Sequence, residues 1–320
     1  MTKIKLTIPV ILLLIMLLAG CRSENPKETD TPTTGEISIS VDETFKPVID
    51  SEIDTFQKIY TYAKINASYK PEAEVISDLL ADSARVVIMS RPFTGEEKKL
   101  FEKREIVPIE RKITYDAIAV IVNNSNSDTT LTMQNFRDIM SGKITRWNQL
   151  GGKSGASDIQ IVFDNANSGT ARYVKNKINN APLAKNTYAV NNNPAVVDYV
   201  AKTRNAIGII GVNWISDKHD TLTHGFLRKI KVVALASDTA KPGEFYQPYQ
   251  AYIAQKVYPL TREVYVLSGE ARAGLGSGFI SFLASDRGQR IFLKAGLVPA
   301  TMPVRLVEIR SENIHINKEQ

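Results

Sequence analysis

The chain has 320 residues, a net charge of +6, 43% hydrophobic residues and a single cysteine. One cysteine excludes an intramolecular disulfide framework, and without long basic runs interleaved with aromatic residues nucleic acid is not an expected partner. The length suffices for two ordinary domains.

The first twenty residues have the layout of a signal peptide. Two lysines precede an apolar run over 10–18, and Leu-Ala-Gly stands directly before Cys21. The run is too short for a comfortable membrane span. Leu-Ala-Gly-Cys resembles the bacterial lipobox, so we predict cleavage after residue 20 and a lipid on Cys21. The alternative is an ordinary signal peptide with a chance cysteine.

Residues 21–35 should form a flexible tether. They hold no apolar side chain able to anchor a core. Loss of 1–20 removes two lysines and no acid, which lowers the net charge from +6 to +4. The folded part is therefore expected to begin near Glu36.

The first elements after the tether read as strands followed by helices. Residues 36–41 alternate with period two, which indicates a strand, and Thr44 is a plausible N-cap for a helix that carries Pro47 in its first turn. The next candidates are a short buried strand over 86–89, a helix opened by the capping box of residues 94–97, and a strand over 117–122.

The same alternation continues along the chain. Its members are a helix over 133–141 with Thr132 as cap and Gly142 at its end, a strand over 159–163, a helix over 171–178 opened by Ser168-Gly169-Thr170, a helix near 195–201, and strands over 206–210 and 231–235. Alternating strands and helices predict an α/β fold with mostly parallel sheets.

Three strand-to-helix junctions carry hydroxyl residues. They contain Thr44, Ser90 with Thr94, and Ser168 with Thr170. Such junctions present free backbone N–H groups and the positive end of a helix dipole, which suits an anion. For any one of them the alternative is a simple helix cap. Three together favour an anion site.

The chain resembles the phosphate-binding proteins of bacterial ABC phosphate importers over about 36–303. The matching strings are Ser90-Arg91-Pro92 with Glu96-Glu97, residues 131–147, Asn167-Ser168-Gly169-Thr170, residues 206–211, Tyr258-Pro259-Leu260-Thr261-Arg262, and Phe282 to Pro299. The resemblance implies a two-lobed, type II periplasmic binding protein fold, in which each lobe is a mostly parallel sheet flanked by helices and the ligand cleft lies between them. The implied divisions are 1–20 signal peptide, 21–35 tether, 36–118 first lobe, 119–234 second lobe and 235–320 return to the first lobe.

The resemblance also implies the ligand-binding residues. Carried over by position, they are Thr44, Ser90, Ser168, Gly169 and Thr170. Two departures stand out, because Asp42-Glu43 replaces glycine and serines of the first loop, and Asp164 stands where the family often places an arginine. Arg91 could supply that missing charge, with Arg172 a weaker candidate. Asp42 or Asp164 could accept the proton of hydrogen phosphate and so disfavour sulfate; solvent exposure is the alternative for both.

The implied function is capture of phosphate for an ABC importer. The expected partners are a permease and an ATPase subunit, with the protein a monomer held by its lipid at the extracytoplasmic face of the cell envelope. The alternatives are another oxyanion, sulfate or molybdate, or a site-altered lipoprotein acting as a sensor or adhesin. Three histidines lack metal spacing and no nucleophile elbow or P-loop occurs, so we expect no enzyme, metal or cofactor.

Overall fold

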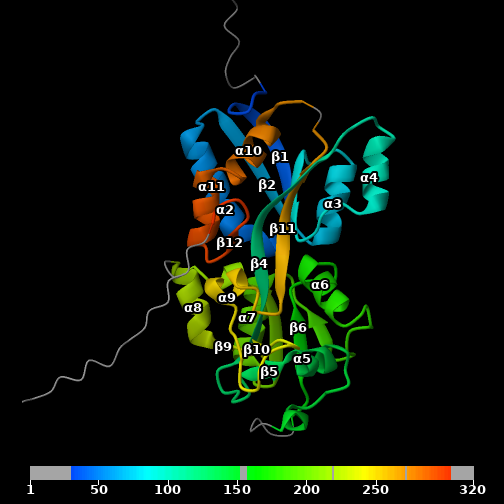
Figure 1. Cartoon of the computed structure of the whole chain (residues 1–320), viewed down its shortest axis with the longest axis vertical. Helices are drawn as coiled ribbons and strands as arrows, with labels where there is room; N and C mark the ends of the chain where they lie inside the picture. Colours follow the sequence, from blue (N-terminus) through cyan, green and yellow to red (C-terminus); the bar gives the residue numbers. More distant parts are fainter. Residues whose placement is uncertain (1–29, 152–156, 218–219, 271, 304–320) are drawn as a thin grey trace, which may run out of the picture.

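The computed structural model describes residues 30–151, 157–217, 220–270 and 272–303 and has two lobes stacked along its long axis (Figure 1). Cys21, the predicted signal peptide and most of the predicted tether lie outside these residues. Within the described ranges, no helix is long and apolar enough to cross a membrane. The expected two-lobed α/β architecture is confirmed.

The upper lobe of Figure 1 contains a sheet in the order β2-β1-β3-β11-β4 with helices on its faces. Its elements are β1 (Gly35–Asp42), η1 (Glu43–Phe45), α2 (Lys46–Ile59), β2 (Ala63–Lys70), α3 (Glu72–Leu80), β3 (Val86–Met89), α4 (Gly95–Glu102), β11 (Thr261–Ser268), α10 (Leu275–Leu283), α11 (Asp286–Lys294) and β12 (Val298–Pro299).

The lower lobe continues the same sheet in the order β4-β8-β6-β7 and adds a two-stranded pair, β10-β5. Its elements are β5 (Thr130–Thr132), α5 (Met133–Met140), η2 (Trp147–Leu150), β6 (Gln160–Phe163), α6 (Gly169–Lys177), β7 (Thr187–Ala189), α7 (Asn193–Lys202), β8 (Ala206–Gly211), η3 (Val212–Trp214), α8 (Thr221–Lys229), β9 (Ile230–Val232), β10 (Ala234–Ala236) and α9 (Gln250–Ala254).

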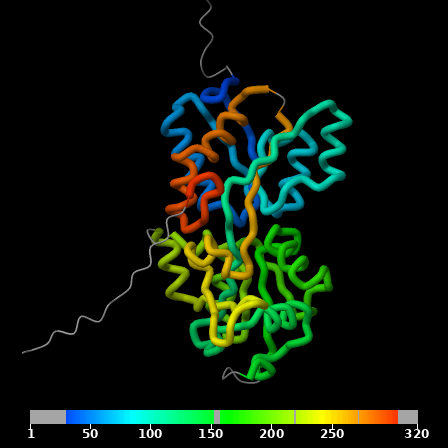
Figure 2. Tube along the Cα trace, viewed as in Figure 1, coloured from blue at the N-terminus to red at the C-terminus, as the bar shows by residue number. Residues whose placement is uncertain are grey.

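One long strand, β4 (Ile109–Asn123), belongs to both lobes. Its residues 109–117 pair with β11, and residues 118–122 pair with β8. Figure 2 shows β4 and β11 running side by side between the lobes. Both strands pair antiparallel to their neighbours, whereas the outer strands of each lobe are parallel as expected. The difference arises because the chain crosses between the lobes in opposite directions along these two strands.

The helix after β1 begins differently from the expectation. Thr44 lies within the turn η1, and α2 has Phe45 as its N-cap, without a side-chain hydrogen bond. The cap of η1 is Asp42, whose carboxylate accepts a hydrogen bond from the Thr44 backbone N–H. A carboxylate commonly bonds the backbone two residues on. The expected capping box at Thr94 and the caps at Thr132 and Ser168 are present.

Asp30, within the range expected for the tether, contacts the upper lobe. The Asp30 carboxylate accepts a hydrogen bond from the backbone N–H of Leu275, the first residue of α10, at 2.9 Å, and it pairs with Arg85 and Arg272. An acidic side chain is favourable at a helix N-terminus. Residues 30–34 are thus packed against the upper lobe and are not part of a free tether.

The return of the chain to the upper lobe also differs from the expected position. Ala234 to Ala236 pair with β5, and Leu235 bridges to Tyr246 in the lower lobe. We therefore propose to place the return near residue 260, at the start of β11, instead of at residue 235. The other division, at 118/119, falls inside β4 and stays a prediction.

Glu52 is a buried carboxyl in the core of the upper lobe. It lies on α2 with 0% exposure, and neither of its oxygens has a hydrogen-bond partner. Burial raises the pKa of Glu52 to about 9. The native state therefore keeps a proton that the unfolded chain releases at a much lower pH. The stability tied to this proton is fully present below pH 4.5 and is lost as pH rises toward about 9.

Glu52→Gln should make the free energy of unfolding less dependent on pH. The amide keeps the shape of the side chain but has no proton to lose. The free energy of unfolding of the variant should therefore rise relative to that of the wild type as pH rises, by at most about 1.4 kcal/mol for each pH unit. Urea unfolding at a series of pH values measures this gain. Glu74→Gln, at an exposed position of α3, is the control. Identical pH slopes for wild type and Glu52→Gln would contradict the assignment.

Candidate functional site

The N-terminus of α6 points toward the upper lobe (Figure 1). Ser168 caps this helix by accepting a hydrogen bond from the Ala171 backbone N–H at 3.1 Å. The Ser168 hydroxyl donates in turn to Asp164 at 2.7 Å, and both residues are buried. The cap leaves the Gly169 N–H free to bond outside the helix.

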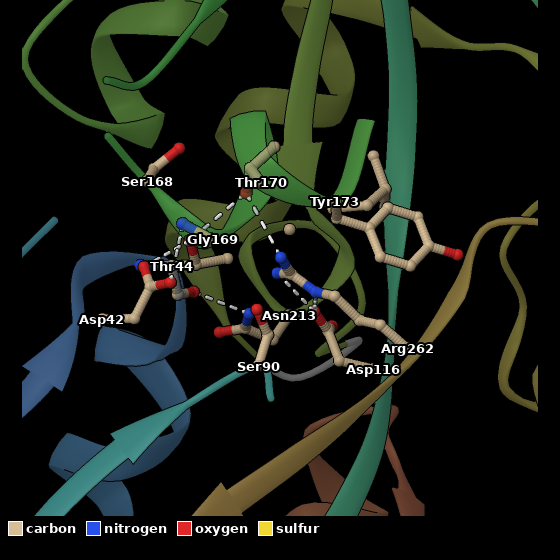
Figure 3. Close-up of polar contacts among 12 residues, drawn as sticks. Asp42, Thr44, Ser90, Asp116, Ser168, Gly169, Thr170, Tyr173, Asn213 and Arg262 are labelled. Atoms are coloured by element: carbon tan, nitrogen blue, oxygen red, sulfur yellow. Dashed lines mark hydrogen bonds and ion pairs between the residues drawn. The ribbon is translucent and has the colours of Figure 1, made fainter. Parts of the chain in front are cut away.

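The end of β1 meets this helix terminus across the two lobes (Figure 3). Asp42 is fully buried, and its Oδ1 accepts hydrogen bonds from the Thr44 N–H at 3.0 Å and the Thr44 hydroxyl at 2.8 Å. Its other oxygen, Oδ2, accepts from the Gly169 N–H at 3.1 Å. The hydroxyl oxygens of Thr44 and Thr170 lie 3.4 Å apart.

Gly169 is required by the crowding at this point. A Cβ added there would lie 2.6 Å from Glu72 Oε2 and from Ser90 Oγ, and closer still to Asp42 Oδ2. A side chain at this position would have to displace these three oxygens. Polar oxygens from three upper-lobe elements therefore converge on the first residue of α6.

Glu72 and Arg172 form a second contact between the lobes. Glu72, the first residue of α3, accepts hydrogen bonds from the Ser90 N–H at 3.1 Å and the Ser90 hydroxyl at 2.8 Å. The Arg172 guanidinium donates to both Glu72 oxygens and, at 3.0 Å, to Ser90 Oγ. A lower-lobe arginine thus binds two upper-lobe residues.

A buried ion pair lies beside these groups. Arg262 on β11 and Asp116 on β4 face each other in the sheet register, and Arg262 Nε donates to Asp116 Oδ2 at 2.8 Å. Arg262 Nη1 lies 3.4 Å from Thr170 Oγ1. Nη2 is 2.7 Å from the same Asp116 oxygen but has no acceptor in hydrogen-bond geometry. Arg262 therefore retains unused hydrogen-bond donors in the interior of the protein.

Burial and neighbouring charges shift the pKa values of the carboxyls. Burial and the nearby Glu72 raise the pKa of Asp42 to about 7, against the opposing effect of Arg262. Burial raises the pKa of Asp164 to about 6, although the Ser168 hydrogen bond opposes it. Burial alone would raise the pKa of Glu72, but its bonds to Arg172 and Ser90 hold that pKa below its usual range.

The structure brings most of the predicted site residues into one cluster, and Arg91 lies at its edge. Clustered are Asp42, Thr44, Ser90, Asp164, Ser168, Gly169 and Thr170. Arg91 instead makes two hydrogen bonds to Glu97, at 2.7 and 2.8 Å, and lies 3.6 Å from Glu72. Its guanidinium is held by the capping box of α4. That the clustered residues bind an anion stays a prediction.

Sequence reasoning missed three members of the cluster. Arg262 stood inside a matching string but without an assigned role, and Asp116 just precedes the predicted strand at 117–122. Glu72 was also missed, although Pro71-Glu72 followed by a second acid, Glu74, is a recognisable helix start. Among the described residues, no group of three or more His, Cys, Asp or Glu side chains could hold a metal ion.

Comparisons with known proteins agree with this architecture. The chain is 25% identical to phosphate-binding protein PstS of Staphylococcus aureus strain USA300 over 309 residues, which cover 95% of this chain and 90% of the relative. With the strain MRSA252 protein of the same name it is 26% identical over 278 residues, 86% of this chain and 81% of the relative.

Solved structures show the same fold. A Clostridium perfringens protein with bound phosphate matches with a TM-score of 0.69 and 24% identity, covering 82% of this chain and 99% of the other. An ABC-type phosphate transport receptor of Vibrio cholerae matches with a TM-score of 0.62 and 22% identity, over 82% and 99% of the two chains. A family model described as the PBP superfamily domain matches residues 26–287. The chain therefore belongs to the PBP superfamily.

Proposed function

We propose that this protein is the solute-binding component of an ABC importer and that its solute is phosphate. The relatives named above are phosphate-binding proteins, and the chain spans most of their length. In this proposal the protein is a monomer that delivers phosphate to a permease driven by an ATPase. A lipid on Cys21 holds it at the extracytoplasmic face of the cell envelope.

The observation that carries the proposal is the set of donors around the start of α6. The Gly169 N–H, the Thr44, Ser90, Ser168 and Thr170 hydroxyls and the buried Arg262 lie together. A helix N-terminus with hydroxyl donors and a guanidinium group matches the needs of an oxyanion. We assign the positive charge to Arg262, whose Nη2 has no hydrogen-bond acceptor, and to Arg172, which lies in the first turn of α6. The Arg91 guanidinium makes two hydrogen bonds to Glu97 on α4.

Asp164 is the candidate for distinguishing phosphate from sulfate. It lies beneath the cap of α6, where its carboxylate accepts from Ser168 at 2.7 Å. Hydrogen phosphate carries a proton that a carboxylate can accept, whereas ionised sulfate carries none and is repelled. An acid close to the helix terminus thus favours a solute that brings its own proton.

Phosphate should raise the melting temperature of the protein. A ligand that binds only the native state stabilises it by about 2.7 kcal/mol at a concentration one hundred times its dissociation constant. Thermal unfolding with phosphate, sulfate and molybdate measures the effect, and calorimetric titration should give one site. A rise in melting temperature with sulfate or molybdate but not with phosphate would identify that oxyanion as the solute in place of phosphate. No shift with any oxyanion would favour the sensor or adhesin, and turnover of a phosphate ester would indicate an enzyme.

Gly169→Ala should weaken phosphate binding by at least about tenfold, or roughly 1.4 kcal/mol. The added methyl group fills the space beside the Gly169 N–H that the Asp42, Glu72 and Ser90 oxygens occupy here and that a bound solute would occupy in their place. Gly225→Ala on α8 is the matched control, because its Cβ meets nothing within 4 Å. Equal affinities of the two variants, measured by calorimetric titration, would show that the solute does not bind at the start of α6.

Cys21→Ser should abolish lipid attachment. The support is the apolar run over 10–18, the Leu-Ala-Gly sequence before Cys21 and the polar segment after it. Metabolic labelling with a radioactive fatty acid should mark the wild type and not the variant. Equal labelling of both proteins would contradict the lipid anchor and leave the solute assignment unaffected.

A further inference from the structure

Two carboxylates of the upper lobe bind donors of the lower lobe. Asp42, at the end of β1, accepts the Gly169 N–H at 3.1 Å. Glu72, at the start of α3, pairs with Arg172, whose Nη2 lies 3.2 Å from Glu72 Oε2. Both contacts reach the first turn of α6, and Figure 3 shows the Asp42 contact directly. The same turn carries the donors that the proposed function gives to phosphate.

The carboxylate oxygens of Asp42 and Glu72 are surrounded by the kinds of donors that surround the oxygens of a bound anion. Asp42 collects one backbone N–H from each lobe and a hydroxyl, and Glu72 collects a backbone N–H, a hydroxyl and a guanidinium. Backbone amides, hydroxyls and arginine are the donors from which oxyanion sites are built. Their oxygens also converge on the Gly169 Cα, as the crowding around an added Cβ shows.

We propose that Asp42 and Glu72 act as internal anions that join the two lobes at the start of α6 and compete with the solute for the donors there. The proposal rests on the proposed function only for the identity of the competing solute. A third negative group at the same point would be repelled by both carboxylates, because charges in a poorly solvated site interact strongly. The solute must therefore displace the Asp42 oxygen from Gly169.

Other contacts between the lobes do not involve these carboxylates. The Ala73 N–H donates to the Asn167 carbonyl at 3.3 Å, and Asn213 Nδ2 donates to the Thr44 carbonyl at 2.8 Å. The Asn193 N–H donates to Glu43 at 3.3 Å. The backbone amides of Ala73 and Asn193 are therefore reporters of whether the lobes are together. Asn193 is distant in sequence from the substitutions below, whereas Ala73 follows Glu72, so its exchange is compared after correction for the intrinsic rate of each sequence.

Amide hydrogen exchange of the full-length chain tests the proposal, in buffer free of phosphate and sulfate and at a pH above the Asp42 pKa of about 7, where this carboxyl is ionised. The variant is Asp42→Asn/Glu72→Gln, which keeps the side-chain shapes and removes both charges. The matched control is Glu36→Gln/Glu74→Gln, which changes exposed acids on the same strand and helix. Arg172→Gln breaks the Glu72 contact from the lower lobe, at a side chain that is 31% exposed, and serves if the double variant does not fold.

We expect the amides of Gly169, Ala73 and Asn193 to exchange at least ten times faster in the double variant than in the wild type and the control. Arg172→Gln should accelerate Gly169 and Ala73 in the same direction. Exchange rates equal to the wild type in both variants would overturn the proposal.

Added phosphate should restore slow exchange in the double variant at a lower concentration than calorimetry requires for the wild type. A higher concentration would show that the two carboxylates do not compete with the solute. If phosphate acts on none of the proteins, the proposed solute is wrong, while the exchange rates without it still decide the role of Asp42 and Glu72.

Discussion

A carboxylate buried between the lobes has to find hydrogen-bond donors, and here many of those donors belong to the opposite lobe. Asp42 is matched by Gly169, Glu43 by Asn193 and Glu72 by Arg172. Leaving a buried charge without partners costs far more than a typical hydrogen bond contributes. The relative placement of β1, α3 and α6 therefore depends on these pairs, and so does the position of the Thr44 and Ser90 hydroxyls relative to the start of α6.

Local patterns in the sequence predicted the elements that carry the site, because caps and short buried strands involve residues close together in the chain. The strand over 86–89, the capping box at Thr94 and the cap at Ser168 are where the sequence places them. The sequence did not predict which residues contact the charged side chains. Arg262 meets Thr170 across 92 positions, and Arg172 meets Glu72 across 100. No pattern within one element contains such a pairing.

Arg91 illustrates the same limit from the opposite side. Arg91 follows Ser90 directly, so its position in the chain indicates an anion site. Its guanidinium nevertheless lies on Glu97, six residues on, whose carboxylate also accepts the Thr94 N–H. A nearby fixed carboxylate offers an arginine two parallel hydrogen bonds without ordering any distant segment. Arg262 has the deeper position because its strand is paired with that of Asp116 along both backbones.

The strand β4 has a consequence for how the molecule comes apart. Its 15 residues complete the sheet of the upper lobe with one half and the sheet of the lower lobe with the other. Neither lobe expressed alone would possess a finished sheet, and each would expose an unpaired strand edge prone to association. The two lobes should therefore unfold as one cooperative unit, so that a substitution destabilising either lobe lowers the melting temperature of the whole protein.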